Sequence, residues 1–333
     1  MSTTRISGWV AFLCLVTCCL SVEAQTRGAR GQSDKKTEVR RSWRVGAEVT
    51  GTNRPITNIL ITFPIPTDWP EQHVNVHEEN IPDEARKADY RDTDGIRQMV
   101  AVIPRLDAGA AMEINVIIDV TVSAIPYPER TDHLVIPQRP PRDIRLTLSP
   151  SPLIESRDRK IKKKVKELVE GVDVPWEQVR KFYEYVTESI EVEGRNVVGA
   201  EQAFKEGKGA AEDLSNVFIA MCRAHRVPAR MVWANNGEYA EFYLQDDTGQ
   251  GKWFPVVLEG SVEFGQMSNP RVIIQKGDNI KVPEKSQRQR FVVEHIRGSG
   301  AGGARPRVRF LRDELPERQR SLNAEKEAAQ NDK

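Results

Sequence analysis

Cys222 and His225 are the residue types of a thiol–imidazole dyad, and their spacing of three places them on one face of a helix. A histidine that removes the thiol proton would make the cysteine a nucleophile. The same face also carries apolar side chains at helical spacing, namely Leu214, Val217, Phe218 and Met221. Because free cysteine is among the most often buried residue types, we interpret the pair as core packing.

His73 and His77 would have the spacing of metal ligands if they lay on a helix. Three carboxylates close to them could add ligands: Glu71, Glu78 and Glu79. The segment lies between Pro70 and Pro82, however, among residues that are expected to form strands and loops. We therefore expect neither a metal site nor a cofactor.

Glu212 and Asp213 are adjacent carboxylates that could share acid–base work. They stand at the expected start of a helix, where negative charge is favourable and a carboxylate can cap free N–H groups. We interpret them as helix-capping residues. The alternative is a cysteine-independent hydrolase that uses Glu212, Asp213 or Glu241.

The first residues of the chain indicate export. Arg5 precedes a short apolar run from Trp9 to Leu20, and small residues follow, ending at Ala24. This pattern is typical of a secretory signal peptide, and the run is shorter than the about 20 apolar residues that span a bilayer. Residues 1–24 are predicted to be a signal peptide cleaved near Ala24, which leaves a secreted or periplasmic chain with no transmembrane segment. Cys222 is then its only cysteine.

The remaining sequence divides into four parts. Residues 25–36 contain Gly, Arg and Ser and show no apolar periodicity, which predicts a flexible lead. Residues 37–150 alternate apolar and polar side chains, as at Ile114, Val116, Ile118, Val120 and Val122, which predicts an antiparallel β-sandwich. Residues 151–296 show helical and then strand patterns. Residues 297–333 are polar and charged, and we expect them to be disordered.

The charge pattern says little about partners. Net charge is +1, so no global field attracts nucleic acid, and we expect no nucleic-acid partner. The lysine-rich helix expected over residues 157–171 resembles a lipid-binding or nucleic-acid-binding patch, but we interpret its lysines as a solvated helix face.

The segment from Val174 to Gly265 resembles the transglutaminase-like family. The features that carry the resemblance are Gly207-x-Gly209 before a helix, Arg223 and Pro228-Ala229-Arg230 at the helix exit, Tyr239-Ala-Glu-Phe-Tyr243, and Trp253-x-Pro255. The resemblance implies a papain-like fold, in which helices pack on an antiparallel sheet. The fold class expected for the whole chain is therefore α+β, a β-sandwich followed by this domain.

The resemblance also implies where a Cys/His/Asp triad would lie. The nucleophile position falls on Ala211, the base on Gly237, and the orienting acid on Val257. No histidine occurs between His225 and His295, so no shift of the alignment supplies a base from this strand region. Cys222 lies about 16 Å along the helix from the nucleophile position. The sequence therefore predicts a pseudoenzyme.

Six residues form the predicted binding cleft of that domain: Glu212, Asp213, Trp233, Tyr239, Glu241 and Trp253. Aromatic side chains in a cleft bind peptides or sugar rings, although the same rings could simply pack the sheet. We expect a binding or scaffolding protein for a protein or cell-envelope polymer. A third alternative, besides the hydrolase, is an architectural module of an envelope assembly.

Overall fold

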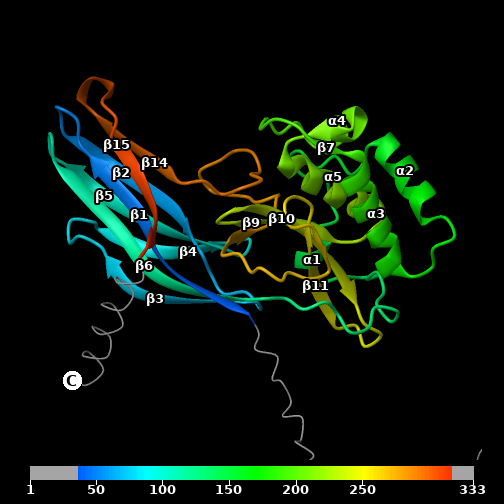
Figure 1. Cartoon of the computed structure of the whole chain (residues 1–333). Helices are drawn as coiled ribbons and strands as arrows, with labels where there is room; N and C mark the ends of the chain where they lie inside the picture. The colour runs from blue at the N-terminus through cyan, green and yellow to red at the C-terminus, as the bar shows by residue number, and fades with distance from the viewer. Residues whose placement is uncertain (1–36, 317–333) are drawn as a thin grey trace, which may run out of the picture. The chain divides into compact units, whose positions relative to one another are not determined.

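The structure is a computed structural model that describes residues 37–316 (Figure 1). The predicted signal peptide and flexible lead lie outside the described residues, as does the last part of the predicted tail, residues 317–333. Within the described part of the chain, no helix has both the length and the apolar character needed to cross a membrane.

Two four-stranded antiparallel sheets form the predicted β-sandwich. Their strand orders are β15-β1-β6-β3 and β14-β2-β5-β4, where β14 is His295–Gly300 and β15 is Arg307–Leu315. The apolar positions of the alternating pattern, such as Ile114 and Val116 on β6, pack in one core with Ile59, Ile61 and Phe63 of β2. The first six strands are β1 (Glu38–Thr50), β2 (Ile56–Ile65), β3 (Gln72–Asn80), β4 (Lys87–Thr93), β5 (Ile96–Leu106) and β6 (Ala111–Ser123). The sandwich prediction is confirmed.

The expectation of a disordered tail from residue 297 is wrong for residues up to 316. β14 (His295–Gly300) pairs with β2, and β15 (Arg307–Leu315) pairs with β1 along nine residues from Thr50 to Ser42. In Figure 1 the red β15 lies beside the blue β1. β15 is an edge strand, so most of its side chains stay solvated and its composition is polar.

Its charges make ion pairs across β1: Arg309 with Glu48, Asp313 with Arg44, and Glu314 with Arg41. Only Leu311 is fully buried. The charged sequence therefore reflects an edge strand and its cross-strand pairs.

The second part of the chain is a helix-and-sheet domain, defined here as residues 142–276. Its antiparallel five-stranded sheet has the order β12-β11-β10-β9-β13. Its strands are β9 (Ala229–Ala234), β10 (Gly237–Gln245), β11 (Gly251–Val257), β12 (Glu263–Phe264) and β13 (Ile273–Lys276). Its helices are α1 (Arg142–Leu146), α2 (Arg159–Val169), α3 (Pro175–Ser189), α4 (Ala200–Glu206) and α5 (Ala211–Ala224), and β7 (Glu191–Val192) pairs in parallel with β8 (Lys208–Gly209).

Helix α5 is the central helix of this domain. It packs on one face of the sheet, where Val217 and Phe218 share a core cluster with Ala240, Phe242 and Leu244 of β10. Residues 213–223 of α5 are all buried because α2 and α3 cover its other side (Figure 1). The odd-numbered side chains of β10 point to the face of the sheet that α5 does not cover. The α+β prediction is confirmed.

Candidate functional site

Asp213 fixes the start of α5. Its Oδ2 accepts a hydrogen bond from the Ala210 backbone N–H at 3.0 Å, and its Oδ1 accepts one from the Gly199 N–H at 2.8 Å. The Val198 N–H also donates to the carboxylate, which is fully buried. Gly209 has no side chain because a Cβ there would lie 2.8 Å from Cβ of Asp213. The capping interpretation of Asp213 is confirmed.

Glu212 and Trp233 are joined by a later part of the chain. Arg290 forms an ion pair with Glu212, and its guanidinium carbon lies 5.2 Å from the centre of the Trp233 ring. Trp233 also packs edge-on against Phe291 and donates its Nε1–H to the Gly277 carbonyl at 2.9 Å. Residues 290–291 therefore cover this end of the predicted cleft.

The three positions implied for a triad hold no group that could take part in one. Ala211 is the first residue of α5, a place where free N–H groups would favour a thiolate. Gly237 is exposed at the start of β10 and has φ +113°, a backbone conformation that favours glycine. Val257 ends β11 and lies in a buried apolar cluster with Tyr239.

Tyr239 packs the sheet in this cluster. It is 1% exposed, its hydroxyl has no hydrogen-bond partner among the described residues, and burial raises its pKa well above the ordinary value. The six residues of the predicted cleft do not form one open cleft, because Asp213 and Tyr239 are fully buried and residues 290–291 contact Glu212 and Trp233. Glu241 and Trp253 do line a common pocket.

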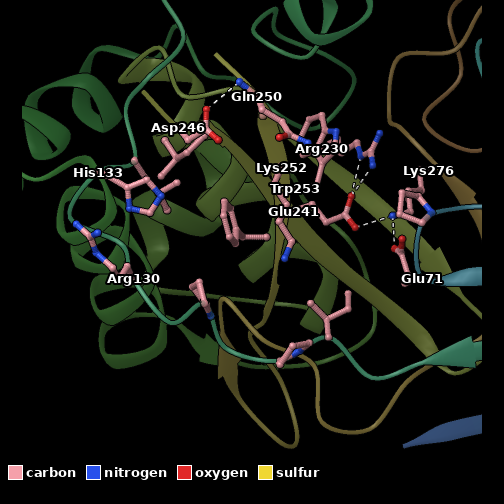
Figure 2. A pocket seen from close by; sticks show the side chains of 18 of the residues that line it. Glu71, Arg130, His133, Arg230, Glu241, Asp246, Gln250, Lys252, Trp253 and Lys276 are labelled. Carbon is pink, nitrogen blue, oxygen red and sulfur yellow. Dashed lines mark hydrogen bonds and ion pairs between the residues drawn. The ribbon is translucent and has the colours of Figure 1, made fainter. Parts of the chain in front are cut away.

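That pocket, here called the Trp253 pocket, has a volume of about 670 Å³. Its walls are the β10–β11 hairpin on one side and residues 124–134 on the other, from which Arg130 and His133 enter (Figure 2). Arg230 and Lys276 complete the charged lining. The sequence places Arg230 at the helix exit, but no local pattern indicates that Lys276, His133 and Glu71 line the same pocket or contact its charged residues.

A chain of alternating charges runs along the inner side of the pocket. Glu241 Oε2 accepts from Nε and Nη2 of Arg230 at 2.8 and 2.7 Å, and its Oε1 accepts from Lys276 Nζ at 2.7 Å. Lys276 also donates to Glu71, which lies just before β3 of the sandwich (Figure 2). The Arg230 guanidinium stacks 3.9 Å from the centre of the Trp253 ring.

The pairing controls the protonation of Glu241. Burial alone would raise the pKa of this carboxyl, but Lys276 and Arg230 outweigh burial and hold the pKa below its ordinary value. Glu241 therefore stays ionised near neutral pH, with both oxygens engaged. A general acid needs a proton at working pH, and a general base needs a free lone pair near its substrate. Glu241 is arranged as a structural anion.

Cys222 and His225 do not form a dyad. Cys222 is fully buried, and burial raises its thiol pKa well above the ordinary value, which opposes thiolate formation. Nε2 of His225 lies 2.8 Å from Oε1 of Gln178 on α3. The core-packing interpretation of Cys222 is confirmed.

His73 and His77 lie on β3, where Nδ1 of His73 is 3.0 Å from Oδ1 of Asp68 and His77 contacts Asp119. In the described range 37–316, no group of three or more His, Cys, Asp or Glu side chains could hold a metal ion.

The central part of the helix-and-sheet domain matches a known family model. Residues 162–257, from within α2 to the end of β11, match the model of the transglutaminase-like superfamily. The chain contains a transglutaminase-like domain. No curated protein matches the chain.

Two solved structures resemble larger parts of the chain. A candidate cysteine protease from Cytophaga hutchinsonii is 15% identical, with a TM-score of 0.49, over 82% of this chain and 100% of its own. A candidate protease from Parabacteroides distasonis is 11% identical, with a TM-score of 0.28, over 70% of this chain and 48% of its own.

Proposed function

We propose that the transglutaminase-like domain is a catalytically inactive binding module of an exported protein. One observation carries the proposal: the positions implied for a triad hold Ala211, Gly237 and Val257. None of these residues has a side chain that can transfer a proton or attack a carbonyl. Cys222, the one cysteine in the described residues, is buried on α5 and cannot substitute for a nucleophile at position 211.

The Trp253 pocket is the proposed ligand site. It is concave, its volume is in the range of ligand sites, and it combines an aromatic ring with several charged side chains. Lys252 is exposed at its rim and has no ion-pair partner among the described residues, so it is available to a ligand. The proposed ligands are a protein segment or a cell-envelope polymer held in a scaffolding role.

The geometry gives less support to a cysteine-independent hydrolase. Both oxygens of Asp213 accept backbone N–H groups, both oxygens of Glu241 are paired with cations, and Glu212 is paired with Arg290. Each of the three carboxylates would have to give up a partner before it could act on a substrate.

The test of inactivity is an amine-incorporation assay and a peptidase assay on the purified chain. We expect no turnover above buffer, and no change when Cys222 is replaced by Ser. Turnover by the wild-type chain that is lost in Glu241→Gln or Cys222→Ser would contradict the proposal.

Binding is tested separately by titration calorimetry with a casein digest and with soluble peptidoglycan. We expect one of the two probes to bind, and Lys252→Glu at the pocket rim to weaken that binding several-fold. Lys87→Glu, an exposed lysine on β4, is the matched control and should bind like the wild type. Equal affinity in all three proteins would remove the Trp253 pocket as the site.

A further inference from the structure

A second concave surface lies between α2 and the end of α5. Its volume is about 730 Å³, and it shares no lining residue with the Trp253 pocket. We call it the basic groove and define it by five cations: Arg159, Lys162, Lys163, Lys166 and Arg226. Val165, Val169, Ala224 and His225 complete the lining, which contains no carboxylate.

The cations from α2 form one continuous stripe. Arg159, Lys162, Lys163 and Lys166 follow the spacing i, i+3, i+4 and i+7, which places all four on one face of the helix. Like charges at such spacing repel one another and destabilise a helix. The stripe is exposed and faces the groove, whereas Ile161 and Val165 anchor the helix in the core.

These charges are mostly not neutralised within the described part of the chain. Lys163 has a single long contact of 3.9 Å to Glu167, whereas Lys164, on the other side of the stripe, pairs with the same carboxylate at 2.8 Å. No ion pair of Arg159, Lys162, Lys166 or Arg226 occurs among residues 37–316. An anion in the groove would relieve repulsion that the folded chain leaves in place.

Arg226 faces α2 from an unfavourable backbone conformation. It follows the C-cap of α5 with φ +65°, at the position where helices most often end in glycine. A long cation at this position adds charge to the groove from the side opposite α2, at a cost in backbone strain.

We propose that the basic groove binds an extended acidic segment of a partner protein. Carboxylates of the segment face the α2 stripe and Arg226, and its aliphatic side chains cover Val165, Val169 and Ala224. The proposal goes beyond the function of the Trp253 pocket, because it assigns a separate surface with its own ligand chemistry.

Other anionic partners fit the groove less well. No Phe, Tyr or Trp side chain lines it, and the one ring that does, the imidazole of His225, already packs edge-on against Phe182, so nucleobases and sugar rings find little stacking surface. A flat membrane could contact the exposed cations but would leave the aliphatic floor of the groove uncovered. An acidic peptide matches both the cations of the walls and the aliphatic floor.

The test uses the purified chain and a fluorescein-labelled peptide of repeated Glu-Glu-Val, with fluorescence anisotropy as the readout. We expect saturable binding that weakens with added salt, because exposed ion pairs are screened. A Gln-Gln-Val peptide should bind at least tenfold more weakly, a difference of about 1.4 kcal/mol in binding free energy.

Charge reversal locates the binding site. Lys162→Glu/Lys166→Glu should weaken the Glu-Glu-Val peptide about tenfold or more, whereas Lys160→Glu, on the same helix but outside the groove, should change its affinity less than twofold. Circular dichroism confirms folding, and Lys162→Gln/Lys166→Gln replaces the double variant if helix repulsion from the new glutamates prevents folding.

Three results would overturn the proposal. The first is equal binding of the Glu-Glu-Val and Gln-Gln-Val peptides. The second is an equal loss of peptide affinity in the groove variant and in the Lys160→Glu control. The third is polyphosphate or heparin binding more tightly than the peptide through Lys162 and Lys166. The last result would assign the groove to a different polyanion.

Discussion

Glu241 both lines the Trp253 pocket and holds two cations of the fold in place. Its two oxygens hold Arg230 and Lys276, and Lys276 in turn reaches Glu71 before β3. The side chains of Glu241 and Lys276 are each 2% exposed, so water cannot replace a lost partner. Removal of the carboxylate charge would leave buried cations with too little compensation.

We therefore predict that Glu241→Gln lowers the free energy of unfolding by about 3–5 kcal/mol, the usual cost of breaking a buried ion pair from one side. Chemical denaturation measures the change. Glu314→Gln removes the partner of Arg41 on the exposed edge of the sandwich and should cost less than about 1 kcal/mol. Equal losses in the two variants would contradict a special role for Glu241.

The lowered pKa of Glu241 predicts that the free energy of unfolding depends on pH. The folded-state pKa of Glu241 lies below its ordinary value of 4.5, so the unfolded chain takes up this proton first as the pH falls. The stabilisation is fully present above about pH 4.5 and is lost as the pH falls through the lower folded-state pKa. The stability difference between wild type and Glu241→Gln, measured by denaturation from pH 7 to pH 3, should shrink below pH 4.5. A difference that stays constant would show that the charge is not the cause.

Cys222 is predicted to be inert towards alkylation in the native chain. It is fully buried, and burial raises its thiol pKa, so both access and thiolate formation are suppressed. Iodoacetamide labelling followed by mass spectrometry from pH 5 to pH 9 should modify Cys222 only after unfolding. Rapid native labelling would instead reveal an activated thiol and weaken the inactive interpretation.

At the scale of the elements, the start of α5 depends on Asp213. Its carboxylate accepts hydrogen bonds from the N–H groups of Ala210, Val198 and Gly199, and so it fastens the loop before α4 to the central helix. Asp213 therefore holds the start of α5, where the family resemblance implies a nucleophile position at Ala211.

We predict that Asp213→Asn lowers the free energy of unfolding by about 2–3 kcal/mol, since a hydrogen bond to a charged group is worth about 1.5–3 kcal/mol and an amide cannot accept at both atoms. Thermal and chemical denaturation measure the loss. Asp173→Asn, a carboxylate in the loop between α2 and α3, is the control and should change stability by less than about 0.5 kcal/mol.

At the scale of the whole chain, the sandwich is built from strands at both ends of the described sequence. β15 pairs with β1 and β14 pairs with β2, while the transglutaminase-like domain lies between them in sequence. The sandwich can therefore be completed only after the domain in the middle has been made.

A chain truncated after Glu294 should lose the cooperative unfolding of the sandwich, because β1 and β2 would each expose an unpaired edge. A chain truncated after Pro316 keeps every described strand and should unfold like the full chain. Limited proteolysis and calorimetry compare the two. Equal stability of both truncated chains would show that β14 and β15 are dispensable.

The sequence alone determined the alternating strands of the sandwich up to β6 and the central helix α5. The period-two alternation in the first domain and the apolar stripe of α5 reflect which side chains avoid water. Both patterns can be read from a short segment without knowing which other segments pack against it. The family resemblance implies that Ala211, Gly237 and Val257 hold the triad positions, and this assignment stays a prediction.

Only the tertiary structure decided which residues share a site. Glu71, Lys276 and Glu241 are far apart in sequence, and they meet because β13 and the residues before β3 come together over the sheet face. The strands after residue 294 were missed for a related reason. Their charges resemble a solvated tail until β1 supplies the opposite charges across the strand pair, and such long-range pairing has no signature in either segment by itself.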